Sequence, residues 1–493
     1  MRKQILMTCI AATVPLFSIA ISSCSKSSNG DTPVTPTDNL DKILFVNKTQ
    51  LGNGDAEFEI NGNYTLPKGT YTMKGWCYIT NGSTLTIPAG TVIKGDKATK
   101  ASLIVERGGK IIAQGTASEP IVFTSAQPAG SRKPGDWGGV IICGKAKNNQ
   151  TEMIIEGGPR SKHGGSDDTD NSGVFSYCRI EFAGYPFATD QEINGLTMGS
   201  VGSGTKIDHV QVSYSNDDSF EWFGGSVNCK YLIAYKGWDD EFDTDNGFSG
   251  KVQFCLGIRD TKIADQSASN GFESDNNANG TTAAPFTSCV FSNMTIIGPA
   301  VQDASFANTS AYINGNGMNP NNGSRLGQFQ AGIQIRRNSH MSCFNSIIAG
   351  YPVGIVIEND KGSATQSAAT AGTFKVNNVI LAACSILGSD KNKSFLDQYS
   401  DNGNTLDATK ESFSSTFFKS MTSDKYYSDF SLLKLSTSAQ YAPQAGSPLL
   451  NAAVFTDALL NSFDKVTYIG AFSGPTDTWM NGWTNFEPQQ TQY

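Results

Sequence analysis

The amino-acid sequence predicts an all-β solenoid of the parallel β-helix type. Three observations lead there: the composition, the two-residue alternation of apolar side chains, and a repeat of about twenty residues. The chain has 493 residues, of which 17% are charged and 51 are glycine. Glycine is thus about a tenth of the chain, against roughly 7% in ordinary proteins. Few charges with many glycines argue against a helical bundle, whose exposed faces need Lys, Glu and Arg.

The first residues carry the pattern of an export signal. Two basic residues precede an apolar run over 5–21, and two serines then lead into Cys24. This arrangement resembles a bacterial lipoprotein signal, in which the cysteine is acylated and becomes the first mature residue. The alternative is a transmembrane anchor, which is disfavoured because the run is short and no stop-transfer charges follow it.

A lipoprotein start sets the expected domain boundaries and location. We expect a signal peptide over 1–23, lipidation at Cys24 and a flexible tether rich in Ser, Thr and Pro over 24–39. The acyl chains would hold the protein on the outer membrane, facing the cell surface or the periplasm.

Cysteine usage points to the core rather than to a metal or redox site. Of ten cysteines, Cys9 falls in the signal and Cys24 takes the lipid, which leaves eight. None forms a CxxC pair, so zinc and redox sites are disfavoured. Sequence does not choose among the possible disulfide pairings, and most of these cysteines adjoin short apolar runs. The favoured interpretation is eight buried, unpaired core residues.

The first coils follow a regular step. Three apolar pairs recur every 18 residues, at Leu85 and Ile87, Leu103 and Val105, and Ile121 and Phe123. Each pair alternates with the period of two that is typical of a strand, and Gly90 and Gly108 mark turns at matching offsets. Strand–turn–strand units repeated in this way indicate a solenoid, whose coils bury apolar residues against their neighbours.

The middle coils are longer and less regular. We align six apolar residues as the inward positions of successive rungs: Leu196, Phe220, Phe242, Phe272, Ile333 and Ile355. The long step before Ile333 contains a Gly- and Asn-rich stretch over 298–332, interpreted as a large loop. We expect the parallel β-helix over 40–384, followed by irregular C-terminal coils and a cap of the same domain over 385–493.

Several segments carry a family resemblance. Residues 103–111, 120–125, 445–452 and 469–472 resemble right-handed parallel β-helix proteins of the pectin-lyase-like superfamily. The resemblance implies a right-handed coil and says little about chemistry. More narrowly, the lipoprotein start, the acidic middle coils and the ending Gly482-Trp483-Thr484 resemble uncharacterised surface lipoproteins of Bacteroidetes. Proteins of that kind often accompany nutrient-uptake systems, which implies an outer-membrane uptake complex as a partner.

The acidic residues concentrate on the middle coils. With the inward residues aligned, Asp243 and Asp245 face outward on one strand, and Glu273 and Asp275 on another. If these strands are neighbouring rungs, about 4.8 Å apart, the four carboxylates converge. Like charges that close need a cation or raised pKa values, and Ca²⁺ takes six to eight oxygen ligands. We therefore predict a Ca²⁺ site here; the alternative is a solvated acidic face that keeps the sheet soluble. The preceding turns carry further acids, at Asp217, Asp218, Asp239, Asp240 and Glu241.

Other residues of this face are candidate ligand contacts. Glu221, Arg336 and Glu358 occupy outward positions on the aligned strands, and Trp238 stands in a turn beside Gly237. Trp238 is predicted to stack on a sugar ring, so the expected partner is an extended glycan. The net charge of −8 argues against nucleic acid as a partner, because phosphate contacts need a basic surface.

The leading functional hypothesis is an exported, lipid-anchored protein that binds a glycan on its acidic face with Ca²⁺. The first alternative is an enzyme, a calcium-dependent polysaccharide lyase or a glycoside hydrolase. The family resemblance implies that a lyase would need a base, here Arg336, Arg337 or Lys236, whereas the Gly-His-Gly of related hydrolases is absent. The second alternative is a structural adhesin or an accessory protein of an uptake system. The sequence favours binding over catalysis and assigns no catalytic residue.

Overall fold

The computed structural model describes residues 39–493 except 152, 189–190, 321 and 402–404. The expected signal peptide, the lipidation site Cys24 and all but the last residue of the tether lie outside the described residues. Within the described part, no helix is both long and apolar enough to cross a membrane.

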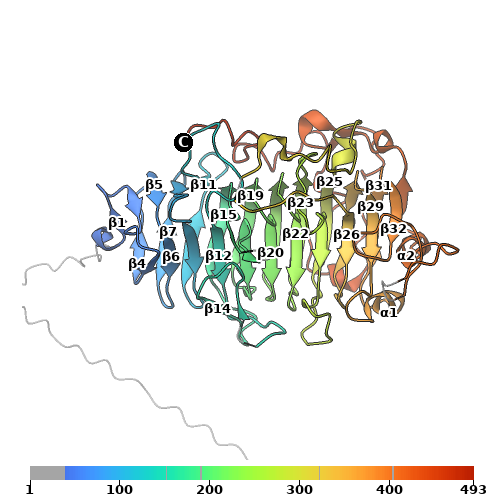
Figure 1. The fold of residues 1–493 in the computed structure, drawn as a ribbon, viewed down its shortest axis with the longest axis horizontal. Coiled ribbons are helices and arrows are strands. Elements are labelled where there is room, and N and C mark those ends of the chain that lie inside the picture. Colours follow the sequence, from blue (N-terminus) through green and yellow to red (C-terminus); the bar gives the residue numbers. More distant parts are fainter. Residues whose placement is uncertain (1–38, 152, 189–190, 321, 402–404) are drawn as a thin grey trace, which may run out of the picture. The chain divides into compact units, whose positions relative to one another are not determined.

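One face of the coil is an 11-stranded sheet in which every neighbouring pair is parallel (Figure 1). Its strands, in spatial order, are β3 (Glu57–Ile60), β6 (Trp76–Ile79), β9 (Ser102–Val105), β12 (Gly139–Cys143), β18 (Leu196–Gly199), β20 (Phe220–Phe223), β22 (Phe242–Asp245), β24 (Phe272–Ser274), β26 (Ala331–Ile335), β29 (Val353–Ile357) and β32 (Ile386–Ser389). Spatial order follows chain order, so each coil adds one rung.

The rest of the coil is an 18-stranded sheet, in which only the pair β1–β2 is antiparallel. Its strands are β1 (Leu44–Phe45), β2 (Gln50–Leu51), β4 (Asn63–Thr65), β5 (Thr70–Met73), β7 (Thr84–Ile87), β8 (Val92–Gly95), β10 (Lys110–Gln114), β11 (Ile121–Ser125), β15 (Gly173–Glu181), β19 (Lys206–Ser213), β21 (Cys229–Tyr235), β23 (Lys251–Ile258), β25 (Val290–Ile297), β27 (Ser342–Phe344), β28 (Ile347–Ala349), β30 (Val376–Asn377), β31 (Ile380–Ala382) and β33 (Lys425–Tyr427).

Short elements decorate the coil. Three two-stranded antiparallel ribbons are β13 (Met153–Ile154) with β14 (Lys162–His163), β16 (Pro186–Ala188) with β17 (Gln191–Glu192), and β34 (Leu435–Ser436) with β35 (Ala442–Pro443). The helices are α1 (Thr365–Thr370) and α2 (Phe413–Ser420), with single 3₁₀ turns η1 (Leu40–Lys42), η2 (Pro299–Val301), η3 (Gly315–Gly317), η4 (Phe430–Leu433), η5 (Thr437–Ala439) and η6 (Ala458–Leu460).

The register of the 11-stranded sheet confirms the predicted rungs. Phe220 pairs with Phe242, Phe242 with Phe272, Phe272 with Ile333, and Ile333 with Ile355. The three phenylalanine rings stack inside the coil with centroids 5.6 and 5.7 Å apart. β24 pairs directly with β26, so residues 298–330 form a loop that adds no rung to this sheet. The predicted all-β parallel β-helix is confirmed.

A column of left-handed residues bends the long strands of the second sheet. Tyr177, His209, Tyr231, Phe254 and Asn293 have φ between 50° and 59° at equivalent places in successive coils. A left-handed conformation costs a non-glycine residue roughly 1–2 kcal/mol. The first four side chains stack on one another, with centroids 4.2, 4.5 and 5.3 Å apart. This aromatic ladder offsets the backbone cost.

All eight cysteines outside the expected signal and lipidation site are buried and unpaired, which confirms the interpretation from sequence. They are Cys77, Cys143, Cys178, Cys229, Cys255, Cys289, Cys343 and Cys384.

The C-terminal region, expected as irregular coils and a cap, does more than close the last coil. β32 and β33 extend the two sheets, and α2 packs against β32 and β29. The remaining residues, 428–493, form what we call the C-terminal strap, which lies along the outer face of the 18-stranded sheet. It ends beside β8, where Lys94 Nζ donates to the Tyr493 carbonyl at 2.6 Å, and Figure 1 shows the C terminus near β11.

Side-chain amides fasten the strap to the coil, and three of them do so through a pair of hydrogen bonds. Asn345, Gln253 and Gln211 each donate to and accept from one strap residue, at 2.7–3.0 Å. The strap partners are Val454, Asp464 and Asn485. Trp479 and Trp483 of the strap pack against the aromatic ladder, with centroids 5.4 Å from Tyr231 and 5.7 Å from His209.

Candidate functional site

Segments from elsewhere in the chain cover the outer face of the 11-stranded sheet on either side of its middle. At one end, Ile104 and Ile141 are buried under Ile155 and Ile193, which come from loops that cross the sheet. At the other end, Val356 is buried in a cluster against which Phe395 packs. Between these two regions lie the rungs of β20, β22 and β24, whose outward residues include the acids Glu221, Asp243 and Glu273.

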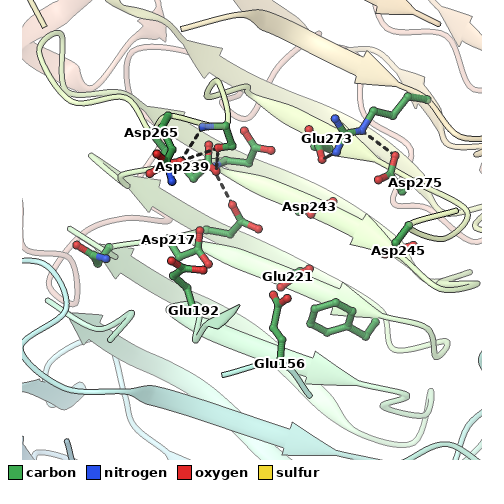
Figure 2. A pocket seen from close by; sticks show the side chains of 18 of the residues that line it. Glu156, Glu192, Asp217, Glu221, Asp239, Asp243, Asp245, Asp265, Glu273 and Asp275 are labelled. Carbon is green, nitrogen blue, oxygen red and sulfur yellow. Dashed lines mark hydrogen bonds and ion pairs between the residues drawn. The ribbon is translucent and has the colours of Figure 1, made fainter. Parts of the chain in front are cut away.

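A cavity of about 400 Å³ occupies this opening. Twelve carboxylates line it, from Glu156, Glu192, Asp217, Asp218, Glu221, Asp239, Asp240, Asp243, Asp245, Asp265, Glu273 and Asp275. Figure 2 labels all of these side chains except Asp218 and Asp240, and shows them gathered around one space from neighbouring strands and from the loops beside them. Two basic residues, Arg336 and Arg337, complete the lining at one side.

Strand register aligns the acids of the floor. Glu221 pairs with Asp243, and Asp243 with Glu273, so three carboxylates face outward from adjacent rungs. Rungs of a parallel sheet lie about 4.8 Å apart. The predicted juxtaposition of Asp243 with Glu273 is confirmed.

The arginines divide the predicted calcium quartet in two. Arg336 forms ion pairs with Glu273 and with Asp275, the latter at 2.9 Å between Nε and Oδ1. Arg337 Nη1 lies 2.6 Å from the other Asp275 oxygen. Asp243 and Asp245 form no ion pair with any described residue. Glu273 and Asp275 are therefore paired directly with arginines, whereas Asp243 and Asp245 feel these arginines only at a distance.

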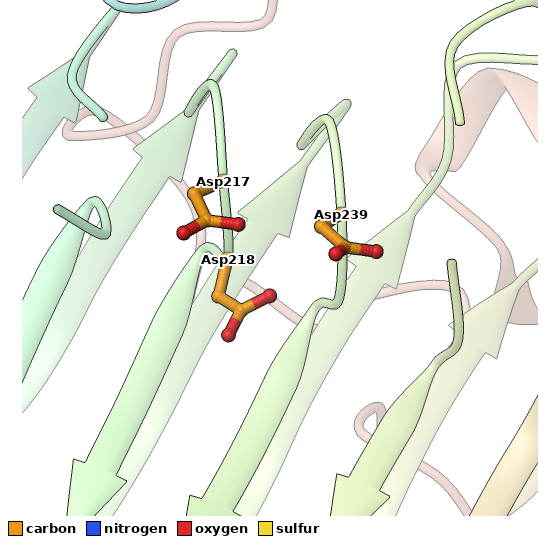
Figure 3. A group of neighbouring side chains, drawn as sticks. All are labelled: Asp217, Asp218 and Asp239. Atoms are coloured by element: carbon orange, nitrogen blue, oxygen red, sulfur yellow. The ribbon is translucent and has the colours of Figure 1, made fainter. Parts of the chain in front are cut away.

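Two groups of carboxylate oxygens are close enough to share cations, and both include Asp218. One group joins Asp217, Asp218 and Asp239, whose oxygens lie within 4.8 Å of one another (Figure 3). The other joins Asp218, Glu221 and Asp243 at the same spacing. Each group contains a buried oxygen without a hydrogen-bond partner among the described residues, Oδ1 of Asp239 and Oδ1 of Asp243.

Hydrogen bonds from backbone N–H groups to side chains of the preceding coil fix the turns that carry these acids. The Asp218 N–H donates to the Asn194 side-chain oxygen at 3.1 Å, and the Asp240 N–H donates to Asp218 Oδ1 at 2.8 Å. The Asn270 N–H in turn donates to Asp240 Oδ1. One Asp218 oxygen is thus part of a ladder of turns, and the carboxylate is held at the cavity with 7% of the residue exposed.

Sequence reasoning noted the acids of these turns but did not place them in the site. The available signal was the position of Asp218 and Asp240, each two residues before an inward phenylalanine. Two residues before such a position is the turn at the end of the rung, where consecutive coils stack their side chains.

Burial and mutual repulsion raise the pKa values of the cavity carboxyls. Burial, reinforced by the neighbouring acids, raises the pKa of Asp218 and of Glu221 well above the ordinary range. Burial and the adjacent Asp275 raise the pKa of Asp243 to about 7, and burial with Asp243 raises that of Asp245 to about 8. Without a cation, the cavity holds protons near neutral pH that a cation would displace.

Trp238 is not a sugar-stacking residue, which corrects the prediction. The side chain is 0% exposed and packs in an apolar cluster with Leu256 and Ile263. Its Nε1 donates to the Arg325 carbonyl at 3.4 Å. Arg325 belongs to the long loop before β26, which closes over a turn that sequence alone leaves exposed.

The other predicted contacts divide between cavity and interior. Glu221 and Arg336 line the cavity, and their role as ligand contacts stays a prediction. Glu358 is 2% exposed and lies outside the cavity lining, which corrects its assignment as a ligand contact. Its rung lies against the first turn of α2, where the Ile357 N–H donates to the Ser414 hydroxyl at 2.9 Å. Lys236, the third candidate base, lies with its Nζ 5.0 Å from the Tyr235 ring centroid and does not line the cavity.

The fold and cavity define a parallel β-helix protein with an acidic site on one sheet. A family model described as a pectate-lyase-like β-helix domain matches residues 58–425, and the chain belongs to this family. The match covers most of both sheets and the whole floor of the cavity. It is consistent with a protein that binds or acts on polysaccharide. No curated protein and no solved structure matches the chain.

Proposed function

We propose that the cavity binds Ca²⁺ and, through it, an extended polysaccharide that carries acidic groups. The observation that carries this proposal is the pair of three-carboxylate groups that share Asp218, each with one buried oxygen lacking a partner among the described residues. Two Ca²⁺ ions, one in each group and bridged by the Asp218 carboxylate, supply the missing positive charge.

The donor set fits calcium. Ca²⁺ accepts six to eight oxygens at about 2.3–2.6 Å with tolerant geometry, so two ligands of one ion are up to about 5 Å apart. The 4.8 Å limit within each group meets that condition. No His or Cys is among the described residues that line the cavity, which disfavours zinc and copper. Mg²⁺ demands stricter octahedral geometry and is a weaker match.

An acidic polysaccharide is the ligand that best suits the cavity once it holds calcium. Without calcium, twelve carboxylates repel an anionic ligand. Calcium held by these residues would supply the positive charge that attracts the carboxylates of the ligand. The adjacent rungs β20, β22 and β24 place acids of the cavity side by side along the sheet, which suits a ligand that carries acidic groups at regular intervals.

Polysaccharide lyase activity is the second candidate, and one observation favours it. Burial and the adjacent Arg337 lower the pKa of Arg336, and a lowered pKa is what a basic residue needs to accept a proton. Arg336 is also held by Glu273 and Asp275, which stabilise its charged form. Binding without cleavage is therefore the leading proposal.

A binding and cleavage screen tests both candidates. Purified protein is measured against neutral and uronate-containing polysaccharides by affinity electrophoresis, with Ca²⁺ or with EDTA. We expect retention by uronate polymers only with Ca²⁺, and its loss in Asp218→Asn. Asp41→Asn, in an exposed ion pair with Lys48, is the matched control. Ultraviolet absorbance from unsaturated uronide would establish a lyase, and Ca²⁺-independent retention would contradict the proposal.

For location, we propose that Cys24 carries acyl chains that anchor the protein to the outer membrane, in the manner of Bacteroidetes surface lipoproteins. An accessory role in a polysaccharide-uptake complex would follow from that location. Metabolic labelling with an alkyne-bearing palmitate should mark the wild-type protein and not Cys24→Ser. Equal labelling of the two would contradict the anchor.

A further inference from the structure

A fully buried ion pair lies beneath the acidic cavity. Arg259 follows β23, and its Nη1 lies 3.2 Å from Glu241 Oε1, with both side chains 0% exposed. The Ser219 hydroxyl donates to the other Glu241 oxygen at 2.9 Å. Neither Arg259 nor Glu241 lines the cavity, so this pair does not contact a bound cation.

The guanidinium of Arg259 joins the backbones of two turns. It donates to the carbonyls of Trp238 and Asp239 in the turn before β22, the first at 3.2 Å. It also donates to the carbonyl of Ile263, in the loop after β23, at 3.4 Å. A planar guanidinium with five N–H groups can hold several acceptors in fixed directions at once, which an ammonium cannot.

Both turns carry acids of the cavity. Asp239 belongs to the first turn, and Asp265 stands two residues after Ile263 in the second. The Ser267 hydroxyl lies within hydrogen-bond distance of both carboxylates, so the turns also meet on the cavity side. The Arg259 guanidinium thus holds the Asp239 carbonyl, and the Ser267 hydroxyl holds the Asp239 carboxylate.

An apolar pair of similar volume could fill the same space, and buried ion pairs are often replaceable in this way without loss of stability. Such a replacement would remove the Arg259 donor from the Asp239 carbonyl and would leave the Trp238 carbonyl with the Ser269 hydroxyl at 3.0 Å. The contribution specific to Arg259 is therefore the orientation of the turn rather than the packing beneath it.

We propose that Arg259, held by Glu241, is a positioning residue for the cation group Asp217, Asp218 and Asp239. This inference rests on the proposed function. It predicts that the group in Figure 3 loses affinity when the guanidinium is removed, although Arg259 touches no ligand. The second group, Asp218 with Glu221 and Asp243, takes no contact from Arg259 and keeps its ion.

The test is calcium titration calorimetry on the folded protein. The double variant Arg259→Met with Glu241→Leu removes both charges, so neither partner is left buried without the other. We expect the stoichiometry to fall from two Ca²⁺ to one, with at least a tenfold loss of affinity at the affected position. A second variant, Arg259→Lys, keeps the positive charge but lacks the planar guanidinium with its five N–H donors. It should show a smaller loss at the same position.

The control is Lys68→Met, which removes an exposed ion pair with Glu119 and should titrate as wild type. Urea unfolding in EDTA checks that each variant is folded. Two ions bound with wild-type affinity by either folded Arg259 variant would overturn the positioning role while leaving the proposed function intact. A wild-type protein that binds no Ca²⁺ would overturn both.

Discussion

Replacing Asp243 with asparagine should stabilise the calcium-free protein at alkaline pH and weaken its response to calcium. Burial and Asp275 raise the pKa of Asp243 from 3.8 to about 7. The folded state binds the Asp243 proton more tightly than the unfolded chain does. Ionisation of Asp243 therefore destabilises the folded state, and the full cost is reached above the folded-state pKa of about 7. Stability should decline as pH rises from about 4 through 7 and then level off.

The magnitude follows from the two pKa values. Each pKa unit is worth about 1.4 kcal/mol, so the difference between 3.8 and about 7 corresponds to about 4 kcal/mol at pH 8. The asparagine side chain is neutral at every pH and removes this penalty. We expect Asp243→Asn to exceed the wild type in unfolding free energy by about 2–4 kcal/mol at pH 8 in EDTA. At pH 4 the difference should be under about 1 kcal/mol.

Calcium should narrow this difference. Binding to the folded state adds about 2.7 kcal/mol at a concentration of 100 times Kd, and the variant lacks one ligand of the second group. The assay is urea unfolding followed by tryptophan fluorescence at pH 4 and pH 8, with EDTA or Ca²⁺, and Asp41→Asn as control. If Asp243→Asn is less stable than wild type in EDTA at pH 8, the reasoning is refuted. Protein contacts would then already stabilise the ionised Asp243 carboxylate.

Three further predictions concern the fold. Truncation after Tyr427 removes the C-terminal strap and uncovers the aromatic ladder, so we expect strong binding of a hydrophobic dye; a soluble protein with no dye binding would contradict the role of the strap. Phe242→Ala, in the stacked column of the core, should cost about 3–5 kcal/mol in urea unfolding, and a cost below about 1 kcal/mol would show a core able to repack. The buried thiols, with the pKa of Cys77 raised to about 12, should resist an aromatic disulfide reagent in the native state. They should react in full after denaturation, and rapid native labelling would contradict their burial.

The sequence predicted rungs well because rung position is a local property. An inward phenylalanine recurs after one coil, and its outward neighbours follow from the alternation of a strand. Asp243 and Glu273 were therefore placed side by side without a structure.

Burial of outward residues was not predictable in this way, because it depends on which distant segment covers each rung. Trp238 is covered through Arg325, which is 87 residues later, and Glu358 lies near Ser414 on a rung closed by α2. The pairing of Arg336 with Glu273 likewise spans 63 residues. No local pattern distinguishes a paired carboxylate from a free one, so the predicted quartet included two acids that arginines neutralise.

The C-terminal strap has a consequence for how the molecule unfolds. In a simple solenoid each coil contacts only its neighbours, so the array can unravel from either end, one repeat at a time. Here one segment is fastened to coils far apart in the sequence, through Asn345, Gln253 and Gln211, and ends at Lys94. Loosening the first coils releases the end of the strap, and loosening the last coils releases its beginning. The strap thus couples the two ends and favours unfolding of the described domain as one cooperative unit.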